Sequence, residues 1–255
     1  TVDFAGTSAQ HQGNLNAPKA VVYAAVLYTF RCLARDKIPL NEGCLRPLKV
    51  LIPDHSMISP EYPGAVISGN TETAQALVGT LFGALRIAAS SQGTMNNFIW
   101  GNEEFQYYET ICGGSGATPD HDGVDAVQTH MTNSRLTDPE ILEWRFPVLL
   151  ESFEIRQGSG GDGKRKGGNG VVRRVKFLSD FKANVLSGPR RIPPYGLEGG
   201  ESGKNGVNFV EHHDGSVTQL SGMDQIALQP GDVFVIKTPG GGGYGEKKAT
   251  SVRST

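Results

Sequence analysis

Long apolar runs in the first half of the chain predict helices. After Pro18, the run KAVVYAAVLYTFRCLA has the length and alanine content of a buried helix, with Pro18 in its first turn. A second run, rich in alanine and glycine, follows a polar turn near Thr71. We therefore expect helices near residues 18–35 and 72–89. Gly79 and Gly83 cost helix stability, so we expect close packing against another element to offset them.

A third helix is predicted near residues 138–145. Thr137, Asp138, Pro139 and Glu140 have the form of a capping box. In that motif the threonine hydroxyl accepts the third helical N–H and the glutamate reaches back. We expect Thr137 to cap the helix and Asp138 to begin it.

After residue 147 the pattern changes to short β-like runs separated by Gly, Pro, Asn and Asp. These runs are VLLESFEIRQ, VVRRVKFL, ANVLS, GVNFV, SVTQL and DVFVIKT. Shorter strand-like runs in the first half cover residues 2–4, 48–52 and 105–111. The predicted fold class is α+β, with helices in the first half packed on mixed strands and a β-rich second half with many glycine turns. The predicted domains are 1–147, which carries the candidate site, and 148–245, followed by a disordered tail at 246–255.

Glycine is abundant, with 34 residues where average usage of roughly 7% would give about 18. The basic run GSGGDGKRKGGNG resembles a phosphate cradle. A P-loop, however, requires GxxxxGK[ST] followed by a helix, whereas β-branched residues follow here. We expect a flexible hairpin loop.

Composition excludes several classes of function. A net charge of −2 provides no basic surface for nucleic acid, and no apolar run approaches the length of about 20 residues that spans a bilayer. Cys32, Cys44 and Cys112 lack metal-ligand spacing and fit reduced thiols. We expect a soluble cytoplasmic protein. Because Thr1 opens a strand-like run without a methionine, we interpret the chain as the later part of something longer or as a processed subunit.

Polar chemistry is concentrated between Gly113 and Glu143. Residues 129–135 supply hydroxyl, imidazole, amide and guanidinium groups within seven positions. The positive N-terminal end of the helix predicted to follow suits an anion or a developing negative charge. The alternative is a buried polar loop attached to a capped helix. His212 and His213 suggest a weaker metal site, since neighbouring side chains on a strand point to opposite faces and Asp214-Gly215 indicates a hairpin turn.

Seven motifs in order resemble the hydantoinase B/5-oxoprolinase family. They are DFAGTSAQHQGNLNAP, SQGTMNN, YYETICGGSGA, THMTNSRLTDPEILE, RQGSGGDGKRKGGNG, PYGLEGG and PGDVFVIKTPGGGGYG. The resemblance covers the later half of the family's domain and is greatest to 5-oxoprolinases. It implies ATP-dependent opening of a cyclic amide, in which 5-oxo-L-proline becomes L-glutamate. ATP and Mg are implied for the complete enzyme, bound mainly outside this chain by a kinase-like hydantoinase A domain or subunit. A divalent metal is also implied, but the family's upstream His/Asp metal motif is not in this sequence, so its ligands are unknown.

Within this reaction we expect His130 to act as a proton shuttle, because imidazole titrates near neutral pH. Asn133 and Arg135 are candidate oxyanion or phosphate ligands. Glu109 lies in a strand buried on both faces, so it needs a partner and acts either as acid/base or as a structural acceptor. The candidate substrate-binding residues are Asn96, Asn97, Gly113, Gly114 and Thr132.

Two alternatives remain open. The second choice, after a 5-oxoprolinase, is a subunit of an N-methylhydantoinase or of an acetone or acetophenone carboxylase type enzyme. In a different class, it is a non-catalytic assembly module whose glycine loops and amides pack against a partner. In each case we expect a homo- or hetero-oligomer.

Overall fold

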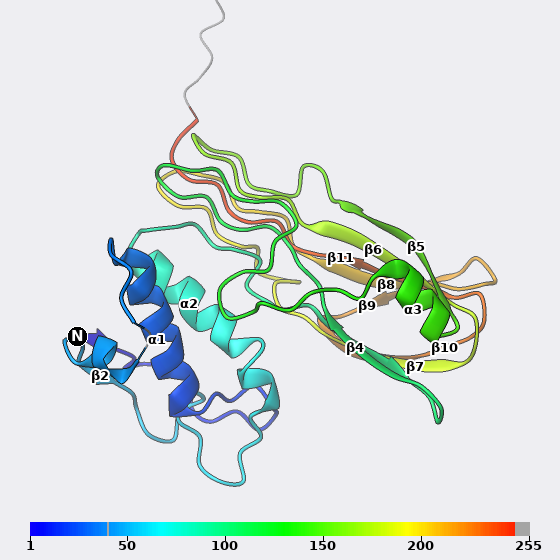
Figure 1. The fold of residues 1–255 in the computed structure, drawn as a ribbon, viewed down its shortest axis with the longest axis horizontal. Coiled ribbons are helices and arrows are strands. Elements are labelled where there is room, and N and C mark those ends of the chain that lie inside the picture. Colours follow the sequence, from blue (N-terminus) through cyan, green and yellow to red (C-terminus); the bar gives the residue numbers. More distant parts are fainter. Residues whose placement is uncertain (40, 248–255) are drawn as a thin grey trace, which may run out of the picture. The chain divides into compact units, whose positions relative to one another are not determined.

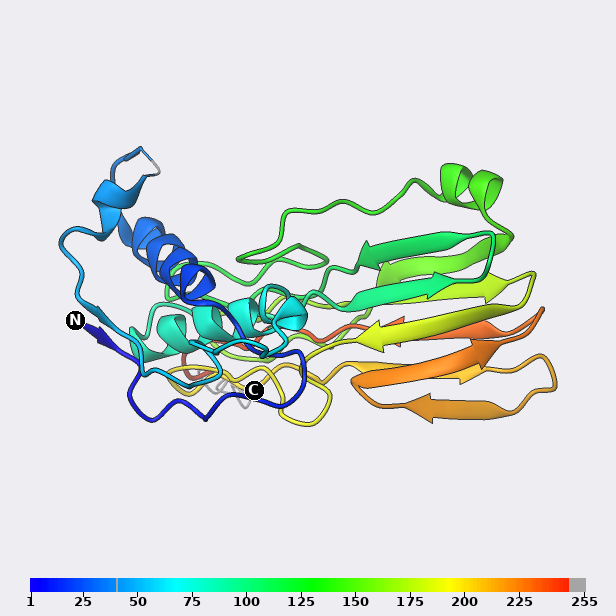
Figure 2. The ribbon, with the colours of Figure 1, turned by 90° about the horizontal axis from the view of Figure 1, so that it is seen from below.

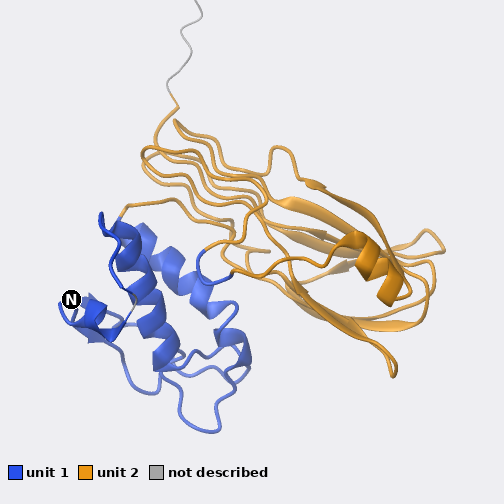
Figure 3. Cartoon of the chain, viewed as in Figure 1, with its two compact units in different colours: residues 1–85, 130–132 blue, residues 86–129, 133–255 orange. Residues whose placement is uncertain are grey.

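The computed structural model describes residues 1–39 and 41–247, and its fold is α+β (Figure 1). The chain divides into two compact units, coloured separately in Figure 3. Unit 1 comprises residues 1–85 and 130–132, and unit 2 comprises residues 86–129 and 133–255. The domain boundary at residue 147 stays a prediction. The expected disordered tail lies largely outside the described residues.

The described residues of unit 1 form two α-helices, two short 3₁₀ turns and a pair of two-residue strands. The elements are β1 Val2–Asp3, α1 Lys19–Leu33, η1 Glu42–Leu45, β2 Val50–Leu51, η2 Ile67–Gly69 and α2 Thr73–Ala84. Both predicted helices are therefore confirmed. They pack through Val22 and Ala25 of α1 and Leu77 and Val78 of α2, whose apolar side chains recur on one face of each helix.

Two expectations about these helices are wrong in detail. The helix α1 is not buried on all sides, because the side chains of Tyr23 and Leu33 are 38% and 43% exposed. A Cβ atom added to Gly79 would meet nothing within 4 Å outside the backbone of its own helix, so the expected close packing is not found at that Cβ position. Close packing occurs instead at Gly69, where an added Cβ would lie 1.9 Å from the backbone oxygen of Asn16.

Unit 2 is built on two antiparallel sheets that face each other (Figures 1 and 2). The four-stranded sheet has the order β10-β7-β3-β4, and the five-stranded sheet has the order β5-β6-β11-β8-β9. The elements are β3 Asn97–Gly101, β4 Gln106–Thr110, α3 Pro139–Arg145, β5 Val148–Ile155, β6 Val171–Phe177, β7 Phe181–Leu186, β8 Val207–Glu211, β9 Val217–Leu220, β10 Met223–Leu228 and β11 Val233–Lys237. All six runs expected in the second half form strands, whereas β3 and β10 were not predicted.

Aromatic side chains fill the space between the sheets. The ring of Phe98 on β3 lies 4.5 Å from that of Phe234 on β11, measured between centroids. Trp100, on the same face of β3 as Phe98, lies 5.4 Å from Phe177 of β6 and 5.1 Å from Phe181 of β7. Alternate residues of β6 are buried, as expected for a strand with one face toward a core.

Glycine-rich extended segments continue from the sheets and run side by side (Figure 1). We call this part of unit 2 the glycine bundle, and it comprises residues 113–117, 159–170, 194–203 and 239–245. Backbone hydrogen bonds cross-link the segments: Gly114 N donates to Pro239 O, Gly168 N to Ser115 O and Gly241 N to Gly168 O, at 2.8–3.0 Å. An added Cβ on Gly241 would lie 1.9 Å from Ser115 O. The run GSGGDGKRKGGNG connects the antiparallel strands β5 and β6, so the expected hairpin connection is confirmed. It is packed within the bundle, however, and is not the free loop that was expected.

The cap of α3 also differs from the expectation. Asp138, not Thr137, caps the helix, and its Oδ1 accepts from the backbone N–H groups of Glu140 and Ile141 at 3.0 and 3.4 Å. Pro139 occupies the first helical position, where its missing N–H costs nothing. The hydroxyl of Thr137 instead forms a hydrogen bond with the Tyr107 hydroxyl, 3.0 Å away.

Candidate functional site

Glu109 points from β4 into the core of unit 2 and meets Arg173 of β6. Arg173 Nε and Nη2 donate to the two carboxylate oxygens at 2.7 and 2.9 Å, and each side chain is only 2% exposed. The Tyr107 hydroxyl donates to the same carboxylate at 3.0 Å. Burial, reinforced by the negative charge of Glu109, raises the pKa of Tyr107 to about 12. Glu109 thus has the partner that a buried acid requires. Because the guanidinium of Arg173 bonds to both carboxylate oxygens of Glu109, the geometry favours a role for Glu109 as a structural acceptor.

The two candidate amides precede or begin β3, and both make hydrogen bonds to other residues of unit 2. Asn96 has a positive φ of 44° and donates to Gln92 Oε1 and Ile111 O, while its own oxygen accepts from Arg190. Asn97 donates to Leu186 O and accepts from the Tyr108 hydroxyl, each at 2.8 Å. These contacts join β3 to its neighbours and make both amides part of the scaffold.

Gly113 and Gly114 are also packed closely against other atoms of unit 2. A Cβ on Gly113 would lie 2.0 Å from Gln92 Oε1, and one on Gly114 would lie 1.9 Å from Gly168 O. Only glycine permits so close an approach. Other parts of the protein fill the space, so these positions are explained by the glycine bundle itself.

His130 belongs to unit 1 and lies among aromatic rings. Its backbone φ is 54°, its Nδ1 lies 3.4 Å from the Tyr28 hydroxyl, and the ring of Phe82 packs edge-on at 5.1 Å between centroids. Burial lowers the pKa of His130 to about 4, because the cationic form loses its hydration. At neutral pH the imidazole is therefore uncharged, with one nitrogen donating and the other accepting. The half-buried Thr132 follows in the same unit.

Asn133 and Arg135 belong to unit 2, and both residues are exposed. Between them, the Ser134 hydroxyl bonds to that of Thr110 at the end of β4. Gln128 Nε2 donates to the backbone oxygen of Thr110 at 3.2 Å. The backbone that carries Asn133 and Arg135 is thus fastened to the four-stranded sheet, while their side chains remain accessible.

The adjacent histidines do not face opposite ways as expected. His212 Nδ1 and His213 Nδ1 lie 3.1 and 3.3 Å from the carboxylate of Asp232. Both residues follow the end of β8, so strand alternation does not apply to them. Burial would raise the pKa of Asp232, but N–H groups of Gln229 and His213 outweigh it, and the pKa is lowered. Within residues 1–39 and 41–247, no cluster of three or more His, Cys, Asp or Glu side chains is suited to hold a metal ion.

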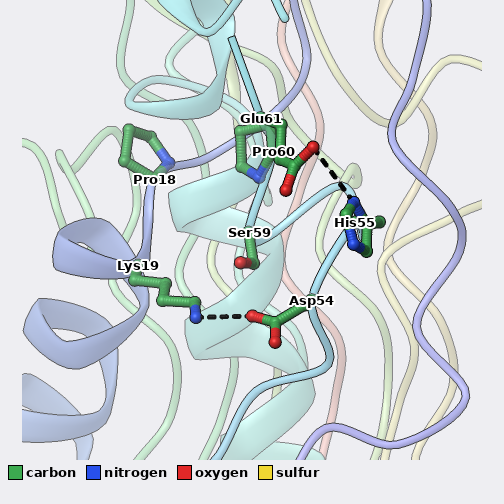
Figure 4. Close-up of a pocket in the computed structure, with 7 residues that line it drawn as sticks. All are labelled: Pro18, Lys19, Asp54, His55, Ser59, Pro60 and Glu61. Atoms are coloured by element: carbon green, nitrogen blue, oxygen red, sulfur yellow. Dashed lines mark hydrogen bonds and ion pairs between the residues drawn. The ribbon is translucent and has the colours of Figure 1, made fainter.

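A polar depression in unit 1 contains charged residues that the sequence did not single out (Figure 4). It has a volume of about 310 Å³, and Lys19 Nζ lies 2.7 Å from Asp54 while His55 Nδ1 lies 3.3 Å from Glu61. His55 has a positive φ of 55°. The pairing of Lys19 with Asp54, 35 positions later, had no sequence signal.

No helix in the part of the chain that the structure describes is long and apolar enough to cross a membrane.

The fold of this chain, with its two facing sheets and its glycine bundle, also occurs in solved structures of ATP-dependent enzymes. A caprolactamase from Pseudomonas jessenii matches with a TM-score of 0.78 and 23% identity, over 94% of this chain and 45% of that chain. An acetone carboxylase matches with a TM-score of 0.82 and 18% identity, over 95% of this chain and 39% of the other. At these identities the matches show the fold alone.

Sequence comparison provides the narrower assignment. The chain belongs to the Hydantoinase B/oxoprolinase family, whose sequence profile matches residues 1–247. Among its relatives are the 5-oxoprolinase of Dictyostelium discoideum, 44% identical over 96% of this chain, and 5-oxoprolinase 1 of Arabidopsis thaliana, 46% identical over 95%. The chain spans about a fifth of the length of these two relatives, 19% in each case.

Proposed function

We propose that the protein containing this chain is an ATP-dependent hydrolase of cyclic amides, and specifically a 5-oxoprolinase. The observation that carries the proposal is the high identity to proteins of that name, which reaches 48% over 96% of the chain for the 5-oxoprolinase of Saccharomyces cerevisiae. A relative from Pseudomonas that bears the name of a D-/L-hydantoinase is 30% identical over the same share of the chain. This contrast favours 5-oxoproline over a hydantoin as the substrate.

The chemistry explains why ATP is needed. An unstrained lactam is stabilised by resonance, so its carbonyl carbon is a poor electrophile. Transfer of the γ-phosphoryl group to the amide oxygen creates a good leaving group at that carbon. Water then attacks that carbon, and the ring C–N bond breaks with protonation of the nitrogen to give an acyl phosphate. A second water hydrolyses the acyl phosphate, which leaves glutamate, phosphate and ADP as the products.

For this chain we propose a part in substrate positioning and hydrolysis, with ATP and Mg held mainly by a kinase-like hydantoinase A domain or subunit. The neutral imidazole of His130 is the candidate for handling a proton or donating a hydrogen bond. The accessible side chains of Asn133 and Arg135 are candidates for binding an oxyanion or phosphate, and Thr132 for binding substrate. Glu109, Asn96, Asn97, Gly113 and Gly114 have contacts that explain them without substrate. A cytoplasmic location and an oligomeric assembly are part of the same proposal.

A panel of substrates tests the proposal on the complete protein. ATP hydrolysis is followed with 5-oxo-L-proline, with a hydantoin, and with acetone plus bicarbonate. We expect stimulation by 5-oxo-L-proline at least tenfold above that by the other two, which is about 1.4 kcal/mol of discrimination. Equal or greater stimulation by the hydantoin or by the ketone would assign the protein to one of the other types. ATP turnover that responds to none of the three would favour a non-catalytic assembly module.

A further inference from the structure

The helix α1 is apolar around its whole circumference, yet one part of it is open. Lys19 and Arg31 are the only charged residues in its sequence, KAVVYAAVLYTFRCL. Helices of this composition are normally buried on all sides. In this structure Tyr23 is 38% exposed and its neighbour Ala24 is also exposed. The exposed part of α1 is therefore as apolar as the buried face of a helix usually is.

The strands β1 and β2 beside α1 form a parallel pair with unused edges (Figure 1). Val2 N donates to Lys49 O at 2.8 Å and Phe4 N to Leu51 O at 2.9 Å. Because backbone groups alternate in direction along a strand, the amides of Asp3 and Val50 point toward the two outer edges. No further strand pairs with either edge within the described residues. A two-stranded sheet is marginal alone, and parallel strands are typical of buried sheets.

A groove lies between the exposed part of α1 and the β1–β2 pair. It has a volume of about 440 Å³ and is lined by Asp3, Ala5, Lys19, Tyr23, Val50, Leu51, Ile52 and Pro53. These residues come from β1 and the segment just after it, from α1, and from β2 with the two residues that follow it. The groove therefore combines a free backbone edge with an apolar wall, which are the two requirements for binding an extended peptide segment.

We propose that this groove receives an extended segment with apolar side chains, supplied by the remaining part of the longer family protein. The segment adds a third strand to the β1–β2 pair and covers Tyr23. Family members contain ample chain for this purpose. The chain spans 44% of a relative from Methanocaldococcus jannaschii with 39% identity, and 45% of the caprolactamase chain. More than half of each of those chains therefore lies outside the matched part.

Amide-resolved hydrogen exchange on the complete protein tests the strand addition. We expect the amide of Asp3 or of Val50, according to the edge that is used, to exchange at least about 100-fold more slowly than in an unstructured peptide. The Tyr23→Lys variant should abolish that protection. Val217→Lys is the matched control, because it places the same charge at a 61% exposed apolar residue of β9. Exchange of both amides at the unstructured rate would overturn the proposal.

Photocrosslinking identifies the occupant. Tyr23 is replaced by p-benzoylphenylalanine in the complete protein, and the peptide joined on irradiation is sequenced by mass spectrometry. A peptide from outside the region matching residues 1–247 supports the proposal. A peptide from within that region, or from a second copy of it, would overturn it. Protection at Asp3 or Val50 without any crosslink to position 23 would also count against it.

Discussion

Burial sets the charge of His130. Its pKa of about 4 in the folded protein lies below the value of about 6.5 in an unfolded chain. Between these values the unfolded chain binds more protons than the folded protein does, so acidification favours unfolding. The contribution of His130 to stability is complete above about pH 6.5 and is lost progressively toward pH 4. The total loss is about 3 kcal/mol.

We therefore expect His130→Asn to flatten the pH dependence of stability. Asparagine tolerates the positive φ of 54° at this position but does not titrate. Chemical denaturation of the complete protein at pH 7 and pH 4.5 measures the difference. The wild type should lose about 2 to 3 kcal/mol more than the variant over this interval. An identical loss in both would show that His130 is solvated and has an ordinary pKa.

The same variant tests the proposed role of His130 in catalysis. Loss of a general acid/base group typically lowers the rate by about 100- to 10,000-fold. We expect His130→Asn in the complete protein to lower kcat at least about 100-fold with little change in melting temperature. His121→Asn is the control, since His121 is exposed in a turn. A normally folded His130→Asn protein with near wild-type kcat would identify His130 as a structural residue.

The Glu109–Arg173 pair allows a second test at single residues. Removing one partner of a buried ion pair leaves an uncompensated charge, at a cost of about 3–5 kcal/mol. We expect Glu109→Met to destabilise unit 2 by this amount, and the double variant Glu109→Met/Arg173→Met to recover most of it. Thermal unfolding measures stability and ATP turnover measures function. A stable double variant that lacks activity would instead make Glu109 part of the reaction.

Among the elements, those with a clear period were predictable from the sequence. The helices α1, α2 and α3 follow from long apolar runs or from a cap, and the alternation of β6 is plain in VVRRVKF. The strand β10 was missed because most of its residues are exposed, and β3 was missed because it begins with a buried amide. Pairing with β4 and β7 is what makes the run NFIWG a strand, and such long-range pairing has no local signal in the sequence.

The glycine bundle was not predictable for a related reason. Its segments have no apolar side chains whose spacing would indicate burial. Their packing depends on backbone hydrogen bonds between parts of the chain far apart in sequence, such as that from Gly241 N to Gly168 O. Local composition therefore indicated flexible loops.

Two glycine substitutions should have opposite effects on stability. Gly79→Ala lies in α2, with no atom within 4 Å of the added Cβ, so we expect a gain of up to about 1 kcal/mol from helix propensity. Gly241→Ala would place its Cβ 1.9 Å from Ser115 O, so we expect a loss of about 1–3 kcal/mol or more from overpacking. Thermal unfolding of both variants provides the comparison. A Gly241→Ala protein as stable as the wild type would show that the bundle is loosely packed.

At the scale of the whole molecule, the family and the fold class were predicted correctly from the sequence, whereas the site residues stay predictions. The ordered motifs identified the family because they extend over nearly the whole chain. Several motif residues proposed for substrate, including Asn96 and Gly114, prove to be engaged in the scaffold. A sequence motif contains both substrate-binding residues and residues that hold the fold together. Only the contacts that each residue makes in the structure distinguish the two kinds. His130, Asn133 and Arg135 remain candidates whose substrate contacts are a proposal.

The most direct test of the proposed function is the stoichiometry of the reaction on the complete protein. It is incubated with ATP and ¹³C-labelled 5-oxo-L-proline, and glutamate and ADP are measured together by NMR and chromatography. We expect one labelled glutamate for each ADP formed, and no glutamate when ATP is omitted. ADP released without labelled glutamate, or glutamate formed without ATP, would contradict the assignment of this protein as a 5-oxoprolinase.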